Sequence, residues 1–124
     1  MDVVIYSETN EQQVEVLLSQ IRRDVEIEPD TVRSFEALFT FLESRVSSNV
    51  IIVFMIYSED ELDALLFSKS RLFNIKFIIV LLEDQETLVT RALAMQPRFL
   101  SFIAEDYTAV CTVVLKMINK KDPL

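Results

Sequence analysis

Two apolar runs constrain this chain more than any other feature of its sequence. Residues 50–57 and 77–82 consist only of Val, Ile, Leu, Phe, Met and one Tyr, without alternation between polar and apolar positions. A strand that is apolar on both faces is covered on both faces, as in the middle of a parallel sheet. Neighbouring parallel strands need crossover connections, which are usually helices. The two runs therefore predict an α/β fold with helices on both sides of a central sheet.

The remaining segments supply three more strands and five helices. Strands are predicted at residues 3–6, 25–28 and 99–103, and Pro29 and Pro97 place the last two at sheet edges, because proline cannot donate to a ladder. Apolar residues at helical spacing predict helices over residues 10–21, 34–46, 58–73, 84–96 and 107–119. The predicted caps are Asn10 with Gln13, Ser34, Ser58 with Glu61, Asp84 and Asp106. Five strand–helix repeats predict one three-layer α/β/α domain over residues 1–124.

Composition excludes several kinds of chemistry. The chain has no His and a single Cys, which excludes Ser-His and Cys-His catalysis, structural zinc and disulfides within the chain. The absence of Gly excludes phosphate-binding loops of the P-loop and GxGxxG kinds, and we expect no cofactor and no metal. A net charge of −8 argues against binding of nucleic acid. No apolar run approaches the ~20 residues of a membrane span, and no basic leader opens the sequence, so we expect a cytoplasmic protein.

The order and character of these segments resemble the receiver domain of two-component response regulators over essentially all 124 residues. The run Ser34-Phe35-Glu36-Ala37-Leu38 also resembles the start of the second helix of a receiver. The resemblance implies a flavodoxin-like, CheY-like fold whose parallel strands lie in the order 2-1-3-4-5.

Receivers bind Mg²⁺ with an acid pair after the first strand and accept phosphate on an aspartate that ends the third. A hydroxyl ending the fourth strand and a lysine ending the fifth contact the phosphoryl oxygens. In this chain the resemblance gives those positions to Ser7 and Glu8, Phe54, Leu82 and Phe102. Phenylalanine has no nucleophilic atom, and no Asp or Glu lies between Asn49 and Ser58. The resemblance is therefore to the pseudo-receiver class, which implies a non-enzymatic signalling module that is not phosphorylated on Asp.

Acidic residues at the ends of the predicted strands leave an alternative open. Ligands of open α/β sheets bind at the carboxyl ends of the strands, and Mg²⁺ prefers oxygen ligands. A Mg²⁺-dependent enzyme or a nucleotide-handling domain could use such acids. Each of them also lies just before or inside the first turn of a helix, where carboxylates cap free N–H groups, and we favour that interpretation. The acids are Glu8, Glu59, Asp60, Glu83, Asp84, Glu105 and Asp106.

The last predicted helix is apolar nearly all round, which indicates a second covered side besides the side on the sheet. We expect this side to contact a protein partner, and receivers commonly pair through the fourth helix, fifth strand and fifth helix. The composition of this helix and the resemblance together predict a homodimer through that face, or a different protein partner on the same helices, with no contact to nucleic acid or membrane. Phe67, Leu72 and Phe73 are expected to be core and turn packing, and Cys111 a small buried apolar residue. The predicted interaction face consists of Arg91, Arg98, Val110, Val114 and Met117.

Overall fold

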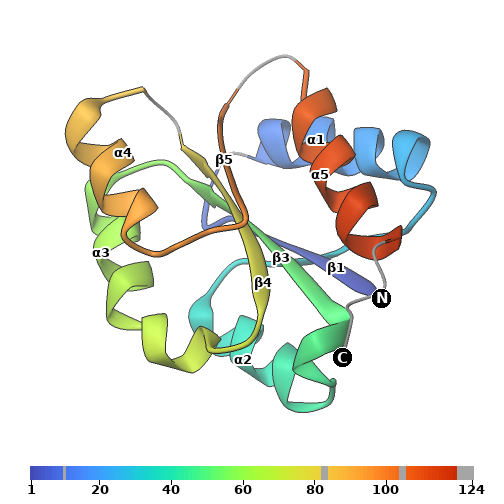
Figure 1. Ribbon diagram of the computed structural model, residues 1–124, viewed down its shortest axis with the longest axis horizontal. Coiled ribbons are helices and arrows are strands. Elements are labelled where there is room, and N and C mark those ends of the chain that lie inside the picture. The colour runs from blue at the N-terminus through green and yellow to red at the C-terminus, as the bar shows by residue number, and fades with distance from the viewer. Residues whose placement is uncertain (10, 82–83, 104–105, 120–124) are drawn as a thin grey trace.

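The computed structural model of the chain contains one parallel sheet of five strands in the order β2-β1-β3-β4-β5 (Figure 1). It describes residues 1–9, 11–81, 84–103 and 106–119. The strands are β1 (Asp2–Tyr6), β2 (Asp30–Val32), β3 (Val50–Ile56), β4 (Lys76–Leu81) and β5 (Phe99–Phe102). The helices are α1 (Glu11–Asp24), α2 (Phe35–Glu43), α3 (Glu59–Phe67), α4 (Glu86–Leu93) and α5 (Thr108–Asn119), with short 3-10 turns η1 (Ser47–Asn49) and η2 (Lys69–Leu72). The predicted fold class and strand order are confirmed.

Helices cover the sheet on both faces, α1 and α5 on one and α2, α3 and α4 on the other (Figure 1). Side chains of a strand alternate between the two faces, so the chain has two apolar clusters. Phe54 belongs to the cluster under α2, α3 and α4, whereas Val53 and Met55 belong to the cluster under α1 and α5. Every residue of β3 and β4 is buried, which confirms that these two runs are covered on both sides. None of the described helices has the length and apolar character needed to cross a membrane.

Most of the predicted helix starts are confirmed by cap hydrogen bonds. Ser34 Oγ accepts from the N–H of Ala37 at 3.0 Å, and Ser58 Oγ accepts from the N–H of Glu61 at 3.2 Å. The carboxylate of Asp106 accepts from the N–H of Thr108 at 2.8 Å at the start of α5. The cap predicted at Asn10 lies outside the described residues. α4 begins after Gln85 without a side-chain cap hydrogen bond, so the role predicted for Asp84 is wrong.

The strand predicted at residues 25–28 is wrong. Val25 still closes α1, since its N–H donates to the carbonyl of Ile21 at 2.9 Å. Glu26 then has φ of 60°, a left-handed conformation that an extended strand excludes. The strand β2 begins only after Pro29, and it does lie at a sheet edge as predicted. β5 forms the other edge, and all four of its residues are half-buried.

Three helices end earlier than their apolar spacing predicts, and α4 ends at Leu93, three residues before the predicted end. α2 ends at Glu43 and α3 at Phe67, and a short 3-10 turn lies between each helix and the next strand. Leu72 is buried as predicted, but Phe67 and Phe73 are exposed, so the core role predicted for both is wrong. Cys111 is buried as expected, and burial raises the pKa of its thiol to about 11.

Candidate functional site

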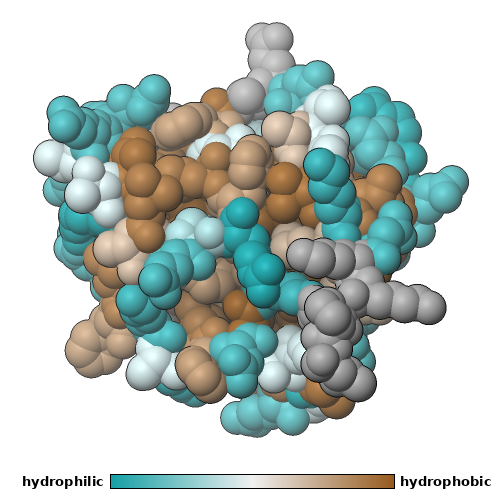
Figure 2. All heavy atoms as spheres, viewed as in Figure 1, coloured by the Kyte–Doolittle hydropathy of each residue, from teal (hydrophilic) through white to brown (hydrophobic). Residues whose placement is uncertain are grey.

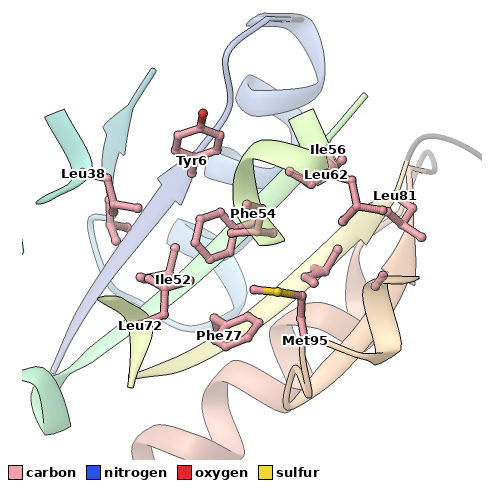
Figure 3. Close-up of a cluster of buried hydrophobic side chains, with 14 of the residues drawn as sticks. Tyr6, Leu38, Ile52, Phe54, Ile56, Leu62, Leu72, Phe77, Leu81 and Met95 are labelled. Carbon is pink, nitrogen blue, oxygen red and sulfur yellow. The ribbon is translucent and has the colours of Figure 1, made fainter. Parts of the chain in front are cut away.

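Phe54 lies where the resemblance to receivers places the phosphoryl acceptor. The parallel register sets it beside Tyr6 of β1 and Ile79 of β4, and its side chain is fully buried. Its ring centroid lies 5.5 Å from the ring of Tyr6 and 5.8 Å from the ring of Phe77. Figure 3 shows Phe54 between these two rings. An apolar side chain without a nucleophilic atom therefore fills this position.

Ser7 and Glu8, at the position of the acid pair, are engaged with their neighbours. The N–H of Ser7 donates to the carbonyl of Val32 at 3.0 Å, and the Ser7 hydroxyl donates to the carbonyl of Thr9. The exposed carboxylate of Glu8 accepts a hydrogen bond from the Tyr6 hydroxyl at 3.0 Å. Burial, followed by this hydrogen bond, raises the pKa of Tyr6, which stays protonated. Only one of the two residues is an acid, Glu8, and its carboxylate is hydrogen-bonded to the Tyr6 hydroxyl.

The ends of β4 and β5 are also apolar. Leu81 closes β4 and is fully buried in the same cluster as Phe54, whereas Leu82 lies outside the described residues. Phe102, at the position that receivers give to lysine, is half-buried and packs against this cluster. The pairing continues beyond β5, because the N–H of Ile103 donates to the carbonyl of Leu81 at 2.8 Å. No ammonium group belongs to this part of the described chain.

Glu61 contributes a buried carboxylate to this end of the sheet. Its Oε2 accepts from the N–H of Tyr57 at 3.2 Å and from the hydroxyl of Ser58 at 3.1 Å. Its Oε1 is buried and has no hydrogen-bond partner among the described residues. Burial raises the pKa of Glu61, and the negative charge of Glu8 adds to this effect. The sequence predicted Glu61 as the capping partner of Ser58 and did not predict its burial.

The other acids of this rim are capping, paired or exposed. Asp106 accepts from Thr108 and from Gln20 Nε2, and these hydrogen bonds lower the pKa of its carboxyl. Glu59 and Asp60 are exposed in the first turn of α3, where their charge favours the helix dipole. Glu83 and Glu105 lie outside the described residues. Over the described ranges, no three Asp, Glu or Cys side chains form a group that could hold a metal ion.

The predicted interaction face needs a correction. Val110 and Val114 are fully buried and Met117 is 8% exposed, and all three pack in the cluster under α1 and α5. The prediction that these three side chains contact a partner is wrong, because they form the stripe of α5 that covers the sheet. The apolar residues on the flank of α5, such as Val113 and Ile118, pack against the same cluster.

A smaller apolar surface remains between α4 and α5. Leu100 and Phe102 of the edge strand β5 are half-buried, and Leu115 of α5 is 38% exposed. Figure 2 shows apolar side chains gathered across the face that presents β5. Arg98 is exposed at the start of β5, and Arg91 of α4 forms an ion pair with Asp63 of α3. The face therefore has an apolar middle and two basic side chains near it.

The comparisons with known proteins identify the fold. No protein-family model matches the chain, and no curated protein matches it. Among solved structures, FixJ-N is 12% identical over 100% of this chain and 98% of its own, with a TM-score of 0.74. RcsB from Salmonella enterica serovar Typhimurium, bound to promoter rprA in the presence of phosphomimetic BeF3−, is 14% identical over 92% of this chain, with a TM-score of 0.65. The chain spans 66% of the length of that RcsB chain. It has the fold of response regulator receiver domains.

Proposed function

We propose that the chain is a receiver-like regulatory module, one domain over residues 1–124, that acts through protein contact and is not phosphorylated on aspartate. The observation that carries the proposal is the burial of Phe54 between Tyr6 and Phe77. A phosphoryl group would need a nucleophile and polar partners there, and the surrounding side chains are apolar. The receiver fold supports a signalling role because it is the fold of FixJ-N and RcsB.

The contact face that we propose is formed by α4, β5 and α5, and its occupant is a second copy of the chain. β5 is an edge strand, and its side chains are only half-buried. The outer edge of such a strand is a usual place for another chain to dock. The proposed face contains Arg91 and Arg98, as the sequence predicted. Its apolar residues are Leu100, Phe102 and Leu115, because Val110, Val114 and Met117 are buried. A two-fold axis would bring the same patch from both copies together, and the arginines would set their orientation.

Exposure to acetyl phosphate or beryllofluoride with Mg²⁺ tests the first half of the proposal. We expect no hydroxylamine-labile gain of mass and no change in the amide spectrum. A phosphoryl group localised to any strand end would contradict the proposal. A Mg²⁺-dependent rise in the melting midpoint without phosphorylation would instead support the alternative of a Mg²⁺-binding enzyme, since a ligand that binds only the folded state stabilises it.

Sedimentation of two neighbouring variants tests the second half. Leu115 is exposed and Val114 is buried, although they are adjacent in α5. We expect the native chain to sediment as a dimer at micromolar concentrations and L115E as a folded monomer. V114E is the matched control and should lose its folded structure. A native chain that stays monomeric, or an L115E variant that still dimerises through unchanged contacts, would contradict the proposed face.

A further inference from the structure

Two phenylalanine side chains are exposed to solvent at the amino end of the sheet. The chain has nine Phe, of which seven are buried or half-buried. Phe67, at the end of α3, is 92% exposed, and Phe73, just after η2, is 79% exposed. Single exposed apolar residues need no explanation, but two large rings on either side of one short turn form an apolar patch.

Both rings line a groove of about 1070 Å³ between η2 and the end of α4. Its base contains Leu72, Phe77 and Met95, which are all buried in the cluster around Phe54. Figure 3 shows these three side chains close to one another at the lower end of the cluster. We call this surface the amino-end groove. The residues that line it include Phe67, Lys69, Leu72, Phe73, Phe77, Met95 and Arg98.

The walls of the amino-end groove are held by the backbone. Asn74 and Gln96, which both line the groove, have φ of 65° and 58°, left-handed conformations that are uncommon in residues other than Gly, although Asn tolerates them best. Lys69 Nζ donates to the carbonyl of Ala94 at 3.0 Å, which links η2 to the end of α4. A groove that is formed before binding loses little conformational freedom when it is occupied.

The charge of the amino-end groove is opposite to that of the whole chain. The net charge is −8, yet the described residues that line the groove include Lys69, Lys76 and Arg98 and no Asp or Glu. Pairing of this groove with itself across a two-fold axis would bring like charges together, which disfavours a symmetric contact with a second copy. A basic rim around an apolar base fits an acidic segment that also carries apolar side chains.

We propose that the amino-end groove binds an acidic segment of a partner protein, which inserts aromatic or aliphatic side chains between Phe67 and Phe73. The acids of the segment would face Lys69 and Arg98, and its apolar side chains would cover the base. This surface lies apart from the proposed α4–β5–α5 dimer face except for Arg98, which borders both.

The test is selection from a random peptide library displayed on phage, with the native chain immobilised and the F67S/F73S double variant used for counter-selection. We expect enriched peptides to combine Asp or Glu with Phe, Tyr, Trp or Leu. The enriched peptide, synthesised with a fluorescein label, should bind the native chain saturably. Single F67S and F73S variants should weaken this binding by about 10-fold or more, and K69E should weaken it as well.

The matched control is K116S, which removes an exposed cation on α5 away from the amino-end groove. K116S should bind the peptide like the native chain, and F67S, F73S and K116S should keep the native melting midpoint. No enrichment, enrichment without acidic residues, or an equal loss of binding in K116S would overturn the proposal. Concentration-dependent head-to-tail oligomers that F73S abolishes would also overturn it, because the occupant would then be a second copy. Peptide binding does not depend on dimerisation, so this test and the sedimentation test fail separately.

Discussion

The two ends of this sheet differ in what fills them. At the carboxyl end, Tyr6 and Phe54 pack against each other and the buried Glu61 carboxylate lies nearby. At the amino end, Phe67 and Phe73 stand in solvent around an open groove. Phe77 belongs to both regions, because it packs edge-on against Phe54 and lines the groove. Open α/β sheets usually bind ligands at the carboxyl end. Among the described residues, the Phe54 position at this end is filled by buried rings, and we call it the closed end, whereas the amino end presents an open groove.

The largest expected effect comes from placing a carboxylate in the closed end. F54D should destabilise the fold by about 4 kcal/mol or more, because it removes a buried ring and buries a charge without a partner. F54L, which keeps the site apolar, should cost only about 1–2 kcal/mol. Urea unfolding measures both. If F54D were as stable as F54L, water would reach position 54 in the folded chain, and the burial described here would be contradicted.

A double-mutant cycle tests whether Phe77 joins the two ends. The rings of Phe54 and Phe77 are perpendicular, with centroids 5.8 Å apart, so F54L and F77L should show a coupling energy of about 1 kcal/mol. F54L combined with F73L is the control, and these changes should add within about 0.5 kcal/mol. A coupling energy of zero between Phe54 and Phe77 would show that the packing of these two rings does not link the stability of the two ends.

The buried carboxylate of Glu61 gives the closed end a pH dependence. The folded state raises the pKa of Glu61 above its value in the unfolded chain, so the folded state binds the proton more tightly. The contribution of Glu61 to stability is therefore complete below the unfolded pKa of about 4.5 and is lost as the pH rises through the raised value. E61Q should remove this part of the pH slope in urea unfolding, and the exposed neighbour in E59Q should not. Parallel slopes for the native chain and E61Q would show that Glu61 is not buried as a carboxylate.

The smallest effect is expected at the open end. F73S and F67S should each change the free energy of unfolding by less than about 0.5 kcal/mol, because exposed rings contribute little packing. Thermal and urea unfolding of these variants, beside F54L, give the direct contrast between the two ends. A loss above about 1.5 kcal/mol would place the ring in the core and remove the groove.

Local signals account for the parts of the fold that the sequence predicted. The runs at residues 50–57 and 77–82 determine the middle strands because they are apolar at every position. Ser34 and Ser58 cap helices through atoms only three residues away. The error at residues 25–28 arose because alternation in four residues cannot reveal the left-handed backbone of Glu26.

The errors at the candidate surfaces have a different physical origin. Counting apolar residues in α5 does not give the width of the space between α1 and the sheet, and this space accepts Val110, Val114 and Met117 together. The exposure of Phe67 did have a signal. Phe67 comes four residues after Asp63, which is exposed, so helical spacing places it on the polar side of α3. The raised pKa of Glu61 had no comparable signal, because it comes from burial in the folded chain and from the charge of Glu8, which is distant in the sequence.

The two apolar clusters also give the chain two separate optical reporters. The sequence has no Trp and only three Tyr, so its near-ultraviolet signals come from few rings. Tyr6 is buried under α2, α3 and α4, and Tyr107 is buried under α1 and α5. Each phenol donates a hydrogen bond to a nearby side chain, Tyr6 to Glu8 and Tyr107 to Gln13. The third tyrosine, Tyr57, packs against the cluster of Tyr107, so both measurements use a Y57F background. Near-ultraviolet circular dichroism of Y6F/Y57F then follows the layer that keeps Tyr107, and that of Y57F/Y107F follows the layer that keeps Tyr6. The two spectra recorded through one urea titration then reveal whether both sides of the sheet melt at the same concentration.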